Sequence, residues 1–162
     1  MKGAVVFLIL TAVGGPADLD RAVDARAAKL GKVALADRPL AQIPRKGALV
    51  RVAFNDVLPI PHDGRGTAFI GRHVLAGGSD FALVTFPSGI EISTRASAVV
   101  VGSYEGAKEI AGQNGAKTTV TVISARVVGV IEGATFAAGV PSFAPNSAIR
   151  VYEAPARKKT RS

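Results

Sequence analysis

Beyond Gly31, apolar residues recur at every second position in a series of short runs, and this alternation restricts the fold more than any other feature. The run from Ala48 to Phe54 is the clearest, since it places Val50, Val52 and Phe54 on one face. A period of two is that of a β-strand with one buried face. We expect strands at Val33–Ala36, Ala48–Phe54, Thr67–Ala76, Phe81–Phe86, Ile90–Thr94, Ala98–Ser103, Thr118–Ser124, Arg126–Ile131 and Ala148–Tyr152.

Turn-forming residues separate these runs. Gly77–Asp80 and Pro87–Gly89 supply glycine, proline and aspartate, and they predict a three-strand meander from Thr67 to Thr94. The stretch Tyr104–Gly115 is a longer excursion, with one helical turn expected around Ala107–Ala111, and it marks a weak seam at 104–115. In the alternation Thr119–Val122 we expect the valines to point inward and the threonines outward.

Residues 18–30 carry the one helical pattern. Their apolar residues fall at helical spacing on one face, Asp18 and Asp20 lie in the first turn, and Gly31 can end the helix. The fold class predicted is mainly β (α+β). One N-terminal helix is followed by an antiparallel β meander, barrel-like or β-clip-like sheet.

The first seventeen residues have the pattern of an export signal. Lys2 precedes an apolar run from Ala4 to Val13, and Gly15 and Ala17 are the small residues that signal peptidase reads. We therefore expect residues 1–17 to be a signal peptide that is cleaved before Asp18. The alternative is that this run is a buried strand at the start of the fold.

The remaining chain reads as one β-rich domain at 18–153 and a basic disordered tail at 154–162. With 162 residues, 48% of them hydrophobic, the chain can bury a core of its own. The formal net charge is +8, and the tail concentrates part of it. The tail's basic residues are Arg157, Lys158, Lys159 and Arg161.

Catalytic chemistry has few candidates in this sequence. There is no cysteine, which excludes disulfides, thiol catalysis and cysteine-ligated metals. His62 and His73 are the two histidines, and neither stands at the spacing of a zinc site. We expect an exposed turn histidine and a strand-surface histidine.

A serine triad can be assembled arithmetically, but no serine stands in a Gly-x-Ser-x-Gly elbow. Its members would come from Ser79, Ser88 or Ser97 with His62 and Asp63. We predict no catalytic residue, no metal and no cofactor, and hence no enzyme.

Nucleic-acid binding is suggested by the charge. A sheet that reads nucleic acid interleaves aromatic and basic residues on one exposed face. Phe69, Arg72, Phe81 and Phe86 lie in neighbouring expected strands without forming such a face, and we expect the phenylalanines to be core.

The segment Glu132–Pro145 patterns poorly as any regular element. We therefore predict it to be a mobile contact region for a partner; the alternative is an ordinary connecting loop. The partner-binding residues expected there are Gly133, Phe136, Gly139 and Phe143.

The order of elements resembles the flagellar P-ring assembly chaperone family. The signal-like start and the helix are followed by Val50–Asp56 and by Phe69–Ala76. The turn Gly77–Asp80 with Phe81–Val84 is similar to the family's Ser-Gly-x-Phe-x-Ala hairpin, and Val120–Val128 is similar to its Val-Pro-Val-Leu-x-Arg strand. The family's Gly-Glu-x-Ile is replaced by Val130–Gly133. The resemblance implies a periplasmic chaperone without catalytic residues.

A second resemblance is to the small barrel that precedes the motor of hexameric DNA-translocating ATPases. It rests on Phe69–Val74, Arg126–Val130 and Pro145–Tyr152, and no Walker loop accompanies it.

Our first hypothesis is accordingly a non-enzymatic, exported assembly factor or chaperone, or a structural subunit of a cell-surface apparatus. Its partners would be a protein client or assembly subunits, with no stable membrane anchor. The alternatives are a cytoplasmic small β-barrel module associated with nucleic acid or a motor, and a structural subunit of a virion or particle.

Overall fold

The computed structural model describes residues 7–35, 39–42, 45–61, 66–75, 77–93, 96–112, 114–133, 135–137, 140–143 and 147–155. Over these residues the chain is mainly β, with one α-helix and a curled mixed sheet, which confirms the predicted fold class. The elements are β1 (Phe7–Gly14), α1 (Pro16–Ala27), η1 (Ala28–Leu30), β2 (Ala34–Leu35), η2 (Leu40–Gln42), β3 (Leu49–Phe54), β4 (Asp56–Ile60), β5 (Thr67–Leu75), β6 (Gly78–Phe86), β7 (Ser97–Ala111), β8 (Lys117–Ile131), β9 (Thr135–Ala137), β10 (Val140–Ser142) and β11 (Ser147–Glu153).

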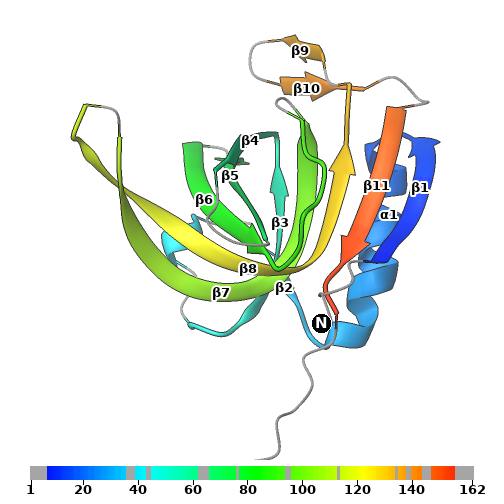
Figure 1. Ribbon diagram of the computed structural model, residues 1–162, viewed down its shortest axis with the longest axis horizontal. Helices are drawn as coiled ribbons and strands as arrows, with labels where there is room; N and C mark the ends of the chain where they lie inside the picture. The colour runs from blue at the N-terminus through cyan, green and yellow to red at the C-terminus, as the bar shows by residue number, and fades with distance from the viewer. Residues whose placement is uncertain are drawn as a thin grey trace, which may run out of the picture.

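The large sheet curls into a half-barrel (Figure 1). Strands β3 and β4 act as one bent strand: β3 pairs with β7, β4 pairs with β5, and between them the N–H of Asn55 donates to the carbonyl of Arg72. The order around the curve is β3/β4, β5, β6, β8, β7, and β6 runs parallel to β8. This is the strand order of an OB-type Greek-key barrel.

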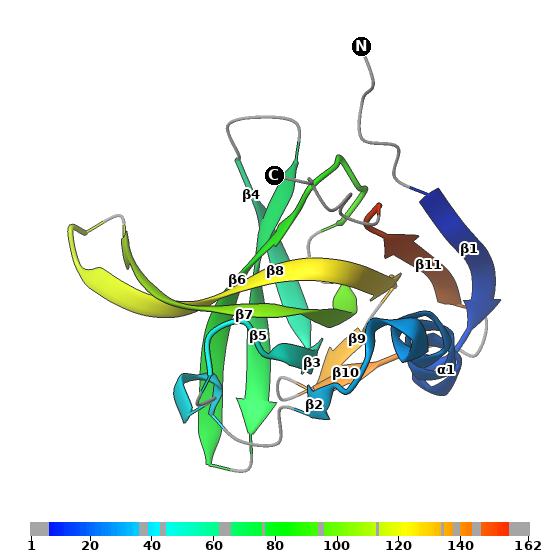
Figure 2. The ribbon, with the colours of Figure 1, turned by 90° about the horizontal axis from the view of Figure 1, so that it is seen from below.

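A second layer lies outside the curve. The end of β8 pairs with β11, β11 pairs with β1, and α1 packs over β7, β8 and β11 (Figures 1 and 2). The sheet is therefore buried on both faces near Ser97–Val101 and Val127–Ile131. The inner cluster includes Phe54 and Phe69, whose rings meet edge to face, and the outer cluster is centred on Leu19 and Val23 of α1.

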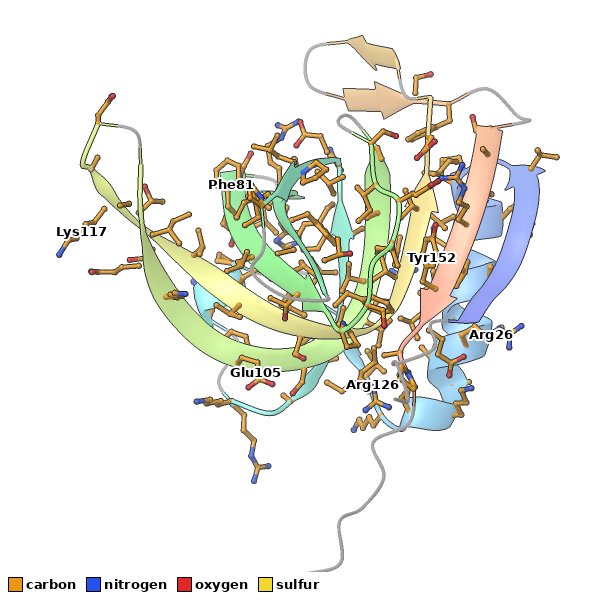
Figure 3. The ribbon with its side chains drawn as sticks, in the orientation of Figure 1. Arg26, Phe81, Glu105, Lys117, Arg126 and Tyr152 are labelled. Carbon is orange, nitrogen blue, oxygen red and sulfur yellow. The ribbon has the colours of Figure 1, made fainter. Side chains whose placement is uncertain are left out.

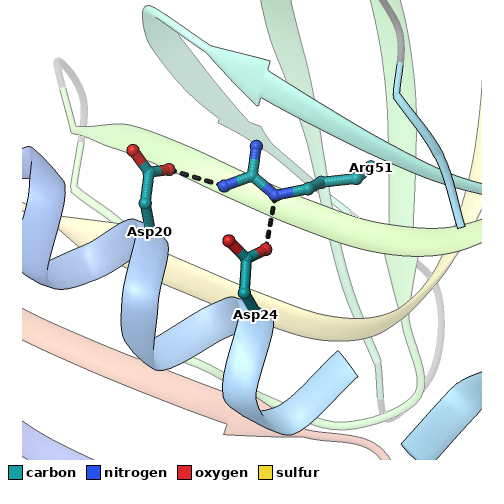
Figure 4. Close-up of polar contacts among 3 residues, drawn as sticks. All are labelled: Asp20, Asp24 and Arg51. Carbon is teal, nitrogen blue, oxygen red and sulfur yellow. Dashed lines mark hydrogen bonds and ion pairs between the residues drawn. The ribbon is translucent and has the colours of Figure 1, made fainter. Parts of the chain in front are cut away.

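Helix α1 is held to the sheet by one arginine as well as by apolar packing. Nη2 of Arg51 on β3 lies 2.6 Å from Oδ1 of Asp20, and its Nε lies 2.7 Å from Oδ1 of Asp24 (Figure 4). Four residues separate the two carboxylates, so they stand one turn apart on the same face of the helix. Burial lowers the pKa of the Arg51 guanidinium, but its hydrogen bonds to Asp20 and Asp24 outweigh burial and raise it overall.

The helix begins before Asp18, its expected first residue, and a strand precedes it. Phe7–Gly14 forms strand β1, and α1 begins at Pro16, because proline suits the first helical turn. Cleavage before Asp18 would remove β1 and that first turn. Cleavage itself stays a prediction.

Two local predictions are wrong. Ile90–Thr94 does not form a third meander strand over its described residues 90–93; instead Ile90 and Ile92 pack against the inner cluster. No helical turn forms at Ala107–Ala111, because β7 continues to Ala111 paired with β8. Segment 132–145, whose pattern indicates no regular element, contains the paired strands β9 and β10. Its role as a contact region stays a prediction.

The orientation expected for residues 119–122 is wrong in part. Thr121 is buried beside inward-facing Ile123, and half-buried Val122 lies on the other face. An extra residue in β7 between Tyr104 and Ala107 shifts the β7–β8 register at this point. Such a bulge can leave a polar side chain inward.

Candidate protein-binding face

The outer side of the half-barrel carries a row of apolar side chains across four strands. Leu58 of β4 is paired with Ile70 of β5, Ile70 with Leu83 of β6, and Leu83 with Val122 of β8. The neighbouring inward residues Phe69, Val84 and Ile123 are buried in the core. Because side chains alternate across a sheet, the row must face outward.

Two more apolar side chains extend this row. Val74 of β5 and Phe81 of β6 are 42% and 44% exposed, and Leu58 is 55% exposed. Their strand positions have the same parity as Ile70 and Leu83, so they lie on the same side of the sheet. We call the surface formed by Leu58, Ile70, Val74, Phe81, Leu83 and Val122 the outer face. An exposed apolar group of this kind is typical of an interaction site.

An arm stands beside the outer face. The ends of β7 and β8, residues 108–112 and 114–119, project beyond the half-barrel as a two-stranded hairpin in both views (Figures 1 and 2). Lys117 of the arm and Phe81 of β6 both lie on the left of the molecule in Figure 3. An isolated hairpin is marginally stable in water, so an arm of this shape is suited to contact another molecule.

The charges on this side are largely balanced. Nε of Arg72 lies 3.2 Å from Oδ1 of Asp56, next to Phe81 in the same row. On the arm, Lys117 pairs with Glu109. Phe69 and Phe86 are buried, as expected, whereas the expectation that Phe81 is core is wrong. Phe81 is thus the one phenylalanine of the outer face, which does not make a stacking platform of several aromatics.

The sequence-predicted contact residues do not come together on this face. Gly133 follows β8 with φ +85°, Phe143 is half-buried against the outer cluster, and Phe136 lies in β9 with its side chain outside the described residues. Gly139 and the tail residues Arg157, Lys158, Lys159 and Arg161 also lie outside them.

Phe143 has a distinct setting. It helps to line an apolar hollow of about 330 Å³ between the start of α1, the end of β3 and the start of β7. A second hollow, of about 430 Å³, is lined by Lys32, Arg45 and Lys46 where β2 approaches β3.

Of the residues considered for catalysis, His73 is buried and paired. His73 is only 4% exposed, so the expectation of a surface histidine is wrong: its Nδ1 lies 2.9 Å from Oδ1 of Asp80, whose Oδ2 accepts the N–H of Leu40. This pairing joins β5, β6 and η2. His62 and Asp63 lie outside the described residues.

The three serines are dispersed. Ser97 donates to the carbonyl of Asn55, Ser79 is exposed on β6, and Ser88 is buried after β6. Within the described ranges no three His, Asp or Glu side chains are grouped to hold a metal ion. Of the helices described, none is long and apolar enough to cross a bilayer.

No family model, curated protein or solved structure matches the chain. The resemblances to the P-ring chaperone family and to the barrel of DNA-translocating ATPases therefore stay predictions.

The outer face was not found from the sequence because its members belong to four separate strands. The register that aligns Leu58, Ile70, Leu83 and Val122 depends on pairings between residues as far as 39 positions apart. One signal was present: Leu83 and Phe81 alternate with Ala82 and Val84, so β6 is apolar on both sides.

Proposed function

We propose that this protein is a non-enzymatic assembly subunit that docks a protein partner on its outer face. The observation that carries the proposal is the apolar row from Leu58 to Val122, with Phe81 and Val74 exposed beside it. Apolar and aromatic side chains of this kind form the centre of protein interfaces. The arm beside this face supplies a second surface that the partner can contact.

The partner's chemistry follows from the face. It would present apolar side chains to the row and polar groups to Asp56 and Arg72 at its rim. The net charge of +8 favours approach by an acidic partner, mainly through the association rate.

The test is capture of the partner from source cells with matched baits, followed by cross-linking mass spectrometry. Leu58→Lys places a charge on the outer face, and Ala25→Lys places the same charge on an exposed position of α1. We expect one protein, cross-linked near the outer face, with wild type and Ala25→Lys. Its recovery should fall about tenfold or more with Leu58→Lys. Equal recovery with all three baits contradicts the proposal.

A second candidate function is binding of single-stranded nucleic acid on the same face. It is favoured by the OB-type strand order, because the second and third strands of that barrel, here β5 and β6, are a common nucleic-acid surface. Phe81 and Arg72 are paired across these strands. Phe81 would stack on a base, and Arg72 would neutralise a phosphate of the backbone.

One substitution separates the two functions. Phe81→Leu keeps an apolar side chain but removes the ring on which a base would stack. If nucleic acid is the ligand, affinity for a labelled single-stranded oligonucleotide should fall by roughly five- to a hundredfold with Phe81→Leu and should weaken with salt. If protein is the ligand, the oligonucleotide should not bind at physiological salt, and partner capture should survive Phe81→Leu.

Two cellular settings for the assembly differ in whether residues 1–17 are kept. A subunit of an exported apparatus, including one related to P-ring assembly, would lose residues 1–17 on export. A cytoplasmic or particle-borne subunit would keep β1 in its sheet, and the pairing of β1 with β11 supports this second setting.

A further inference from the structure

Basic residues gather around a hollow beside the start of β3, which we call the basic hollow. It has a volume of about 430 Å³, and its charged lining residues are Lys32, Arg45 and Lys46. The rest of its described lining is small or apolar: Ala34, Gly47, Ala48 and Leu49. None of these residues carries a carboxylate, so the basic hollow presents three positive charges and no negative one.

The backbone fixes the position of two of these cations. Arg45 and Lys46 open a β-turn in which the Ala48 N–H donates to the Arg45 carbonyl over 3.1 Å. Gly47 takes φ +89° in this turn, a conformation that glycine adopts without strain. The turn is also tied to β7, because the Gly47 N–H donates to the Tyr104 carbonyl and the Tyr104 N–H donates to the Ala48 carbonyl. The cationic turn is therefore held in one place.

Lys32 reaches the basic hollow from a different segment. It lies just before β2, whose Ala34 pairs in parallel with Val50 of β3. The same register, continued back to the turn, sets Lys32 level with Ala48. Two segments that are separate in the sequence thus bring their positive charges to one hollow.

These cations are not neutralised within the part of the chain that the structure describes. Lys32, Arg45 and Lys46 are exposed, and none of them forms an ion pair with a described carboxylate. Elsewhere basic side chains do pair with carboxylates: Arg21, Lys29, Arg51, Arg72, Lys117 and Arg150. Like charges around one hollow repel each other, and a bound anion would remove that repulsion.

We propose that the basic hollow binds a small polyphosphate, a ligand with two or more linked phosphate groups. Arginine can donate two parallel hydrogen bonds to one phosphate, and lysine holds phosphate as a point charge, so the lining matches this chemistry. A monocarboxylate would balance only one of the three charges. The volume lies within the range of roughly 300–1000 Å³ that is usual for small-molecule sites. The basic hollow shares no residue with the outer face, so this inference goes beyond the proposed function and does not rest on it.

The experiment is calorimetric titration of the full chain with sodium tripolyphosphate in about 0.15 M salt, where long-range attraction to net charge is largely screened. We expect saturable binding of one ligand per chain and a higher melting temperature with ligand present. Arg45→Gln and Lys46→Gln should each raise the dissociation constant about fivefold or more, because each removes a charge-assisted contact. Arg45→Lys should raise it less, since it keeps the charge and loses the fork.

Lys117→Gln is the matched control, because it removes the same charge from an exposed position on the arm. It should leave the dissociation constant nearly unchanged. An equal effect of Lys117→Gln and Arg45→Gln would show attraction to net charge alone and would overturn the inference. No saturable binding of tripolyphosphate, or equal affinity for inorganic phosphate, would also overturn it.

Two further measurements separate this site from the functions proposed for the outer face. Leu58→Lys should leave tripolyphosphate binding intact while it loses the protein partner. If a single-stranded oligonucleotide binds, depends on Arg45 and Lys46, and tripolyphosphate does not compete with it, the ligand is a nucleic acid and the inference is wrong. Circular dichroism of the ligand-free variants, all changed at exposed side chains, checks that they fold.

Discussion

Nε of Arg51 donates a 2.7 Å hydrogen bond to Oδ1 of Asp24, and this bond joins strand β3 to helix α1. The arginine side chain is 17% exposed, so the contact is partly shielded from solvent. A second bond from the same guanidinium to Asp20 makes the contact a clamp of two carboxylates on one cation.

We predict that Arg51→Met lowers the free energy of unfolding by roughly 1–2 kcal/mol, since methionine keeps the apolar stem but removes both charge-assisted bonds. Arg51→Lys should lose less, because an ammonium retains the charge without the planar fork. Urea unfolding at neutral pH measures both. Equal stability of Arg51→Met and wild type would show that α1 is held by its apolar face alone.

The start of α1 should make stability depend on pH. The Gly15 N–H donates to Asp18, and Arg21 hydrogen-bonds to it, so the pKa of the Asp18 carboxyl lies below its ordinary value of 3.8. A carboxyl with a lowered folded pKa adds stability above its unfolded pKa and loses it as the pH falls through the folded pKa. The contribution should therefore be complete above about pH 4 and fade below it.

Asp18→Asn tests this expectation. Asparagine can still accept the Gly15 N–H but cannot titrate, so the variant should unfold with a smaller pH dependence below about pH 4. Thermal melts from pH 2 to pH 7 compare the two proteins. If the melting temperatures of wild type and variant fall in parallel with pH, other carboxylates cause the loss of stability in acid.

Gly71 lies where β5 passes over a core ring. A Cβ built on it would fall 2.5 Å from Cδ1 of Phe54, and the Phe54 ring is itself packed against Phe69. Gly71→Ala should therefore destabilise the fold by about 1–3 kcal/mol through overpacking. Gly77→Ala is the matched control, because a Cβ there meets nothing within 4 Å. Denaturant midpoints of the two variants that agree within error would contradict the close approach.

Local pattern was sufficient for the elements that bury one face. Val50, Val52 and Phe54 alternate in the sequence, and all three are buried in the inner cluster. Leu19, Val23 and Ala27 follow helical spacing, and all three are buried in the outer cluster against β7, β8 and β11. Gly31, with φ +107°, ends the short 3₁₀ turn after α1 at the expected position. In each case the period of a single segment determines which side chains are covered.

Pairing between distant segments was decided by the tertiary structure alone. The apolar run at the N-terminus reads equally as an export signal or as a strand, and only its register with β11, about 140 residues later, makes it β1. The parallel contact of β6 with β8 and the extra residue in β7 place Thr121 inside and Val122 outside. Arg51, Asp20 and Asp24 become one clamp for the same reason. Strand register is a long-range choice, and a shift of one residue reverses every side chain that follows, so no local period can reveal it.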